Sequence, residues 1–164
     1  MLALLTRFGR SFTGWTKLVT HEGVTVLFPE HPMRACSTSE SPWGTMYCTM
    51  YRGQWKDSTA SSILTIRDYD SATLLEPDQL FSGWKEEFKR AMNEHHLPLV
   101  RVKEKLSVDK HHRCDLLYAN REETQFTRVS LIAQGNRLII LFAVGMLQEV
   151  LTPACSESFR SLRP

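Results

Sequence analysis

Two pairs of adjacent histidines and one cysteine are the residues in this sequence best suited to chemistry. The pairs are His95-His96 and His111-His112, and Cys114 follows the second pair by two residues. On a strand, His112 and Cys114 would project from the same face, and imidazole and thiolate are ligands that Zn²⁺ prefers. The sequence therefore offers a candidate metal site at His112 and Cys114, completed by His95 or His96.

Exposed turns provide a simpler interpretation of the same histidines. The first pair follows a predicted helix, and a positively charged imidazole at the carboxyl end of a helix interacts favourably with the helix dipole. The second pair follows Asp109-Lys110 and precedes a predicted strand. We prefer the exposed-turn interpretation, and we therefore expect neither a bound metal nor another cofactor.

Strand geometry disfavours covalent catalysis by Cys114. Same-face neighbours on a strand stand roughly 6.5 Å apart, whereas a nucleophilic thiol must lie within hydrogen-bonding distance of its activating imidazole. Cys114 alternates with Leu116 and Tyr118, so a place in the core explains it. The sequence also contains no phosphate-binding loop, dinucleotide fingerprint or nucleophile elbow. We therefore expect no enzymatic activity.

Aromatic and methionine side chains gather between residues 43 and 55 and favour a binding function. In the predicted strand 45–51, three sulfur-containing side chains alternate with Tyr47, Thr49 and Tyr51, so the two sets project from opposite faces. Side chains of these types anchor partners at protein interfaces, although ordinary core packing is the alternative. The predicted partner-binding residues are Trp43, Tyr47, Tyr51 and Trp55.

Length and composition indicate one ordinary globular domain. The chain has 164 residues, of which 42% are hydrophobic and 23% charged, and a domain of this size buries roughly 70% of its unfolded surface. Its 20 basic and 18 acidic residues leave a net charge of +2, so we do not expect nucleic acid as a partner. The four cysteines form no CxxC pair, which argues against a zinc finger, and the sequence leaves both thiols and disulfides open.

The beginning of the chain is basic and amphipathic. The first 21 residues contain three basic residues and no acidic one, with apolar residues at helical spacing. We assign residues 1–22 to an amino-terminal arm and residues 23–164 to a single α+β domain. A cytoplasmic location is slightly favoured, because no clear signal peptide or membrane-spanning run is present. Packing on its own domain, peripheral membrane contact through residues 1–18 and targeting are alternative roles for the arm.

Hydrophobic periodicity predicts an antiparallel sheet and two helices. Gly135-Asn136 between two apolar runs is typical of a type II′ hairpin, and the Ser- and Thr-rich segment 35–43 is predicted to be a loop. We therefore expect a curved antiparallel sheet packed against one principal helix, with a short helix at the carboxyl end. The predicted strands are 23–28, 45–51, 61–68, 99–106, 113–120, 124–134 and 137–144, and the predicted helices begin at Pro77 and Pro153.

Several of these features resemble the PsbP-like and Mog1-like superfamily. The matching residues are the strand and prolines of 24–32, Gly44 and Tyr47 in the next strand, the helix 77–92, the hairpin at Gly135-Asn136 and Ser158-Phe159-Arg160. The resemblance implies a curved antiparallel sheet flanked by helices, and binding rather than catalysis. Relatives include a Ran-binding nuclear-transport factor, photosystem II extrinsic subunits and bacterial adaptors. It assigns no functional residue, because none of their partner contacts maps onto a motif here.

These observations lead us to expect a non-catalytic domain that binds a protein or peptide through an aromatic sheet face and its adjoining loops. A metal-binding protein or metal-dependent enzyme centred on His112 and Cys114 is one alternative. Peripheral attachment to a membrane through the amino-terminal arm is the other.

Overall fold

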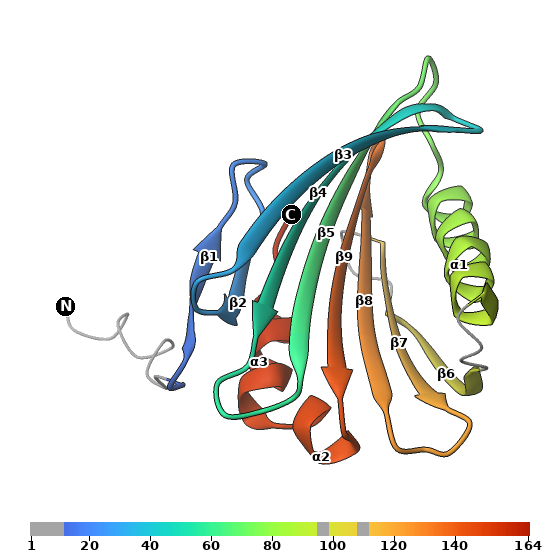
Figure 1. The fold of residues 1–164 in the computed structure, drawn as a ribbon. Helices are drawn as coiled ribbons and strands as arrows, with labels where there is room; N and C mark the ends of the chain where they lie inside the picture. The colour runs from blue at the N-terminus through green and yellow to red at the C-terminus, as the bar shows by residue number, and fades with distance from the viewer. Residues whose placement is uncertain (1–11, 95–98, 108–111) are drawn as a thin grey trace.

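A curved, seven-stranded antiparallel sheet forms the centre of the structure (Figure 1). The structure is a computed structural model that describes residues 12–94, 99–107 and 112–164. The strands are β3 (Met33–Ser41), β4 (Gly44–Gln54), β5 (Ser61–Asp70), β6 (Leu99–Ser107), β7 (Arg113–Asn120), β8 (Phe126–Gln134) and β9 (Arg137–Gly145). Their order across the sheet is β3-β4-β5-β9-β8-β7-β6, so β3 and β6 are the two edges.

The two faces of the sheet are covered by different elements. The long helix α1 (Pro77–Glu94) packs on one face, which we call the α1 face. The other, which we call the hairpin face, carries the hairpin of β1 (Trp15–Val19) and β2 (Thr25–Pro29) together with α2 (Leu147–Val150) and α3 (Pro153–Ser161). Strand β9 is apolar without interruption because both of its faces are covered: Leu138 and Ile140 pack under α1, whereas Ile139 and Leu141 pack on the other side.

Helix α1 is amphipathic, and its apolar side faces β7, β8 and β9. Pro77 occupies the first helical position, where its missing N–H costs nothing. Leu80 and Trp84 are buried, and the Trp84 ring stacks on Phe88 with centroids 4.9 Å apart. Phe88 in turn contacts Tyr118 of β7 at 5.1 Å. This aromatic cluster fixes the helix over the β7, β8 and β9 part of the α1 face and leaves the part formed by β3, β4 and β5 uncovered (Figure 1).

Hydrogen bonds join β2 to α3 on the hairpin face. The Ser158 hydroxyl donates to the Leu27 carbonyl at 2.6 Å, and the Leu27 N–H donates to the Ser161 hydroxyl at 2.7 Å. Thr152 caps α3 by accepting a hydrogen bond from the Cys155 N–H. The β1–β2 hairpin therefore has backbone contacts with the carboxyl end of the chain although it belongs to a separate two-stranded sheet.

The α+β class and the antiparallel sheet are confirmed, and all seven predicted strands and both predicted helices occur close to their expected positions. Gly135 has φ +57°, as the first central residue of a type II′ turn requires. The prediction of a loop over 35–43 is wrong, because most of this segment belongs to β3. Eight of its nine residues are exposed, and all but Met33 are polar or small, so no alternation marked it; pairing along its whole length with β4 holds it extended.

The amino-terminal segment forms a strand where the spacing of its apolar residues suggested a helix. Residues 1–11 lie outside the described residues, whereas residues 15–19 form β1. The Trp15 ring meets Trp55 edge to face at 5.1 Å, and Leu18 packs against the same core cluster, so the described part of this segment lies on its own domain. Among the described residues, no helix combines the length and apolar character that crossing a bilayer requires.

Candidate functional site

Two of the four aromatic residues predicted to bind a partner are buried in the core of the hairpin face. Tyr51 is 5% exposed and its hydroxyl donates a hydrogen bond to Glu22 at 3.1 Å. Trp55 is 6% exposed and its indole N–H donates to the Ser62 hydroxyl at 2.8 Å. Both polar atoms are thus satisfied inside the domain, as buried tyrosine and tryptophan require. In this structure neither side chain is available to a partner.

The other two aromatic residues lie on opposite sides of the sheet. Trp43, in the turn between β3 and β4, is half-buried beside α1 and contacts Tyr69 edge to face at 5.4 Å. A Cβ atom at Gly83 of α1 would overlap the Trp43 ring, so the helix approaches this ring closely. Tyr47 is 52% exposed and projects from the hairpin face, because it shares the register of Tyr51. The structure therefore does not bring the four predicted residues together.

The predicted metal ligands are also separated as far as the structure describes them. His112 is exposed in a left-handed conformation, with φ +47°, just before β7. Cys114 is fully buried in the cluster under α1. His95, His96 and His111 lie outside the described residues. Within residues 12–94, 99–107 and 112–164, no group of three or more histidine, cysteine, aspartate or glutamate side chains is placed to hold a metal ion.

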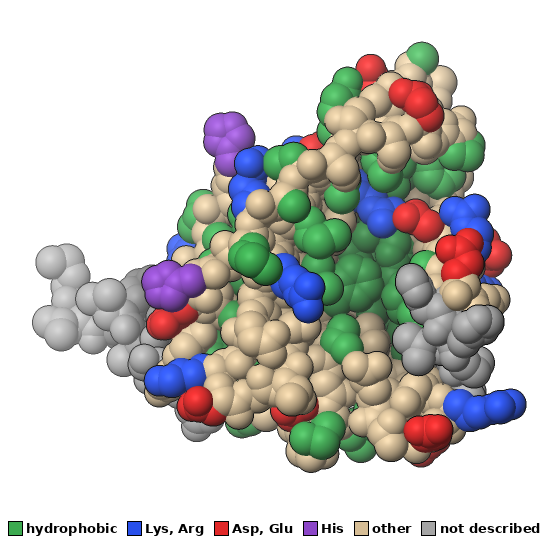
Figure 2. Space-filling model, in the orientation of Figure 1, with side chains coloured by type: hydrophobic (Ala, Val, Ile, Leu, Met, Phe, Trp, Pro, Cys, Tyr) green, Lys and Arg blue, Asp and Glu red, His purple; other side chains and the backbone are tan. Residues whose placement is uncertain are grey.

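An uncovered region of the α1 face is the strongest candidate site. No described helix or hairpin lies over β3, β4 and β5 on this side (Figure 1), and Figure 2 shows hydrophobic side chains gathered there around a basic one, beside a recess next to α1. Met33 is 68% exposed and Met50 39% exposed. We call this region the open patch and define it as Met33, Met50, Arg52, Ile63, Phe142 and Val144.

Strand register places these side chains on one face. Met33 pairs with Arg52 of β4, Arg52 pairs with Ile63 of β5, and Ile63 pairs with Phe142 of β9. Paired residues in an antiparallel sheet project from the same side, so the four form one row across four strands. Met50 lies beside this row, two residues before Arg52 along β4. The row thus has exposed Met33 at one end and the half-buried Phe142 ring at the other.

Arg52 is a cation in the middle of this apolar row. Its side chain is exposed, and no described residue forms a hydrogen bond or ion pair with it. A guanidinium presents five N–H donors in a planar fork that matches a carboxylate. The open patch therefore offers apolar contact area together with one recognition point for an anion.

The second arginine near the patch is already neutralised. Arg67 of β5, whose side chain is 14% exposed, donates to both carboxylate oxygens of Glu87 on α1, at 2.7 and 3.2 Å. Burial acts to lower the pKa of Arg67, but the hydrogen bonds and charge of Glu87 outweigh it and raise the pKa. Beside this pair, burial raises the pKa of the Cys48 thiol, which keeps the thiol protonated at neutral pH. This border fixes α1 against the sheet.

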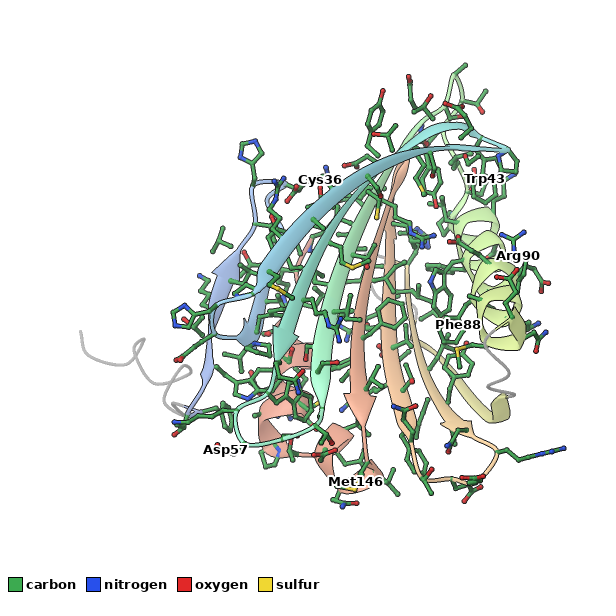
Figure 3. The ribbon with its side chains drawn as sticks, viewed as in Figure 1. Cys36, Trp43, Asp57, Phe88, Arg90 and Met146 are labelled. Carbon is green, nitrogen blue, oxygen red and sulfur yellow. The ribbon has the colours of Figure 1, made fainter. Side chains whose placement is uncertain are left out.

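Aromatic side chains form the wall of the patch toward α1. Phe88 points from α1 toward the sheet (Figure 3), and its ring centroid lies 6.2 Å from that of Phe142. Phe142 is also 6.0 Å from the buried Trp84 ring. Because both phenylalanines are half-buried, they link the core under α1 to the exposed methionines.

Sequence reasoning missed the open patch because its members lie on four strands, one of which was read as a loop. The alternation in β4 correctly placed Met50 opposite to Tyr51 but did not show which side was covered. Arg52, one residue beyond the predicted strand 45–51, was the available indication of a charged position on the methionine side.

Comparison with known proteins gives no independent assignment: no family model matches this chain, and neither does any curated protein sequence.

Proposed function

We propose that this chain is a non-catalytic binding domain that recognises a short, mainly apolar segment of another protein through the open patch, with an acidic residue of that segment bound by Arg52. The observation that carries the proposal is the uncovered row of Met33, Arg52, Ile63 and Phe142 on the α1 face.

The side chains of the patch favour a peptide over a highly charged ligand. Methionine is flexible and polarizable, so Met33 and Met50 can adapt to the shape of a bound side chain. Arg52 is the only charged residue among the described members of the patch, and the nearby Arg67 is neutralised by Glu87 at the border. One cation surrounded by apolar area matches one carboxylate within an apolar segment.

The resemblance to the PsbP-like and Mog1-like superfamily supports the same class of function. We propose membership on the strand and proline pattern of 24–32, the helix 77–92 and the hairpin at Gly135-Asn136. Because a fold does not determine a function, the binding role rests on the open patch.

Selection from a displayed library of random peptides tests this proposal. We expect the enriched peptides to combine an apolar run with one Asp or Glu. Calorimetry with a selected peptide should show binding at least about tenfold weaker for Arg52→Glu, because the charge reversal repels the carboxylate. Met50→Glu should weaken binding similarly by placing a charge among apolar contacts.

Two exposed positions outside the patch provide matched controls. Arg121→Glu makes the same charge change in the exposed segment between β7 and β8, and Leu74→Glu places a charge in the exposed segment before α1. Both variants should bind the selected peptide as the original chain does. Equal affinity of the Arg52→Glu and Arg121→Glu variants, or failure to enrich any apolar peptide, would contradict the proposal.

A further inference from the structure

Strand β3 is an exposed edge of the sheet. It spans nine residues, Met33–Ser41, and eight of them are exposed. Its inner side pairs with β4 along the full length, whereas no described strand pairs with its outer side. Strands with a free edge present backbone N–H and C=O groups that can join another strand.

The two edges of the sheet differ in the features that normally prevent such pairing. Strand β6, at the opposite edge, contains four charged residues, namely Arg101, Lys103, Glu104 and Lys105. Strand β3 contains only Arg34 and Glu40, and it has no lysine or proline within it. Charged residues, lysine above all, and proline discourage edge pairing, and the sequence of β3 contains fewer of them than that of β6.

The two charges of β3 are placed symmetrically about its centre. Arg34 lies three residues before Ser37 and Glu40 lies three residues after it. Antiparallel pairing of β3 with a second β3, centred on Ser37, therefore puts Arg34 opposite Glu40 of the second copy, twice by symmetry. If the pairing is centred on Cys36 or on Thr38 instead, Arg34 and Glu40 of the two copies no longer face each other. The attraction between these charges therefore selects the Ser37 register.

The side chains involved are compatible with this pairing. Arg34 and Glu40 project from the same face, and both are exposed. In one copy, Arg34 uses Nε to contact the Tyr51 hydroxyl at 3.3 Å and Nη2 to contact Glu22 at 3.4 Å, which leaves further guanidinium N–H groups for a second carboxylate. Glu40 accepts one hydrogen bond, from Thr45 at 3.1 Å, and a carboxylate can accept several.

We infer that two copies of this chain associate through antiparallel pairing of their β3 edges in the register centred on Ser37. The result is a continuous 14-stranded sheet, twice the seven strands of one copy. The partner is a second copy of the same chain, and the inference stands independently of the peptide proposed for the open patch.

Charge reversal tests the register. Sedimentation velocity at about 100 μM protein, which populates even a weak dimer, should show a dimer for the original chain. Glu40→Arg should weaken dimerisation at least about tenfold, because it places Arg34 opposite an arginine. The double variant Arg34→Glu with Glu40→Arg should restore the dimer. A monomeric original chain, or a double variant that stays as weak as Glu40→Arg, would overturn the inference.

Disulfide trapping supplies a second test, which does not require the dimer to be strong. Position 37 is also the pairing partner of Cys48 on β4 within one copy, so Cys48 is replaced as well as Cys36. In a Cys36→Ser, Cys48→Ser background, Ser37→Cys places two thiols directly opposite each other at the symmetry axis, within the range of Cα separations that a disulfide spans. It should form a covalent dimer on mild oxidation. Ser39→Cys in the same background is the control, because its two copies stand about 14 Å apart along the paired strands and should stay uncrosslinked. Equal crosslinking of the two variants would contradict the register.

Discussion

Replacing Gly83 by alanine tests whether Trp43 locks the β3–β4 turn against α1. In an exposed helix interior this change stabilises a protein by about 1 kcal/mol, because glycine loses more backbone entropy on folding. Here the added Cβ would overlap one atom of the Trp43 ring, and it would also lie only 3.0 Å from a second ring atom, Cζ3. Overpacking of this kind costs about 2 kcal/mol. We therefore expect a net destabilisation of about 1 kcal/mol.

The sign should reverse when the ring is removed. In a Trp43→Ala background the clash is absent, so Gly83→Ala should stabilise by about 1 kcal/mol through helix propensity alone. The difference between the two backgrounds, about 2 kcal/mol, is the coupling between the positions. Urea unfolding followed by far-ultraviolet circular dichroism measures all four proteins. A stabilising effect of Gly83→Ala in both backgrounds would refute the close packing of Trp43 on the helix.

Three further predictions concern charged and thiol groups. Burial acts to raise the pKa of Glu22, but hydrogen bonds from its own backbone and neighbouring side chains outweigh it and lower the pKa below the ordinary 4.5. The contribution of ionised Glu22 to the free energy of unfolding is therefore complete above pH 4.5 and is lost as the pH falls through the lowered pKa. Between pH 7 and about pH 3, the free energy of unfolding measured with urea should fall more for the original chain than for Glu22→Gln, and an equal fall would contradict this role of Glu22. Glu87→Gln should destabilise by about 1 to 3 kcal/mol in urea unfolding, because Arg67 stays largely buried without its anion; an unchanged midpoint would mean that the pair contributes nothing. Iodoacetamide labelling read by mass spectrometry should modify exposed Cys36 but leave Cys155 protected, since burial raises the pKa of Cys155 to about 11; equal labelling rates would contradict this burial.

The sequence predicted the elements whose periodicity reports burial. Helix α1 showed its apolar stripe, and β9 its uninterrupted apolar run, because each packs directly on the core. Strand β3 lacked such a pattern, since both of its faces are exposed and only the backbone ladder with β4 holds it. Strand β1 was obscured because Trp15, which packs on Trp55, also fits a helical spacing with earlier apolar residues.

The site could be predicted only to the level of alternating faces. Alternation in β4 separated Tyr47 and Tyr51 from Met50, but burial depends on what covers each face. The β1–β2 hairpin covers the Tyr51 side, and that hairpin pairs with distant parts of the chain, including residue 163. Tyr51 is therefore buried, whereas Met50 on the opposite side is exposed. Such long-range coverage has no local sequence signature.

Nuclear magnetic resonance mapping of a bound peptide tests most directly whether the open patch is a binding site. Titration with a peptide selected on the original chain should shift backbone amide resonances in β3, β4, β5 and β9 around Arg52, and in α1 near Phe88. The Arg52→Glu variant should show these shifts only at higher peptide concentration. Shifts confined to the β1–β2 hairpin, α2 and α3, on the opposite side of the sheet, would contradict the account.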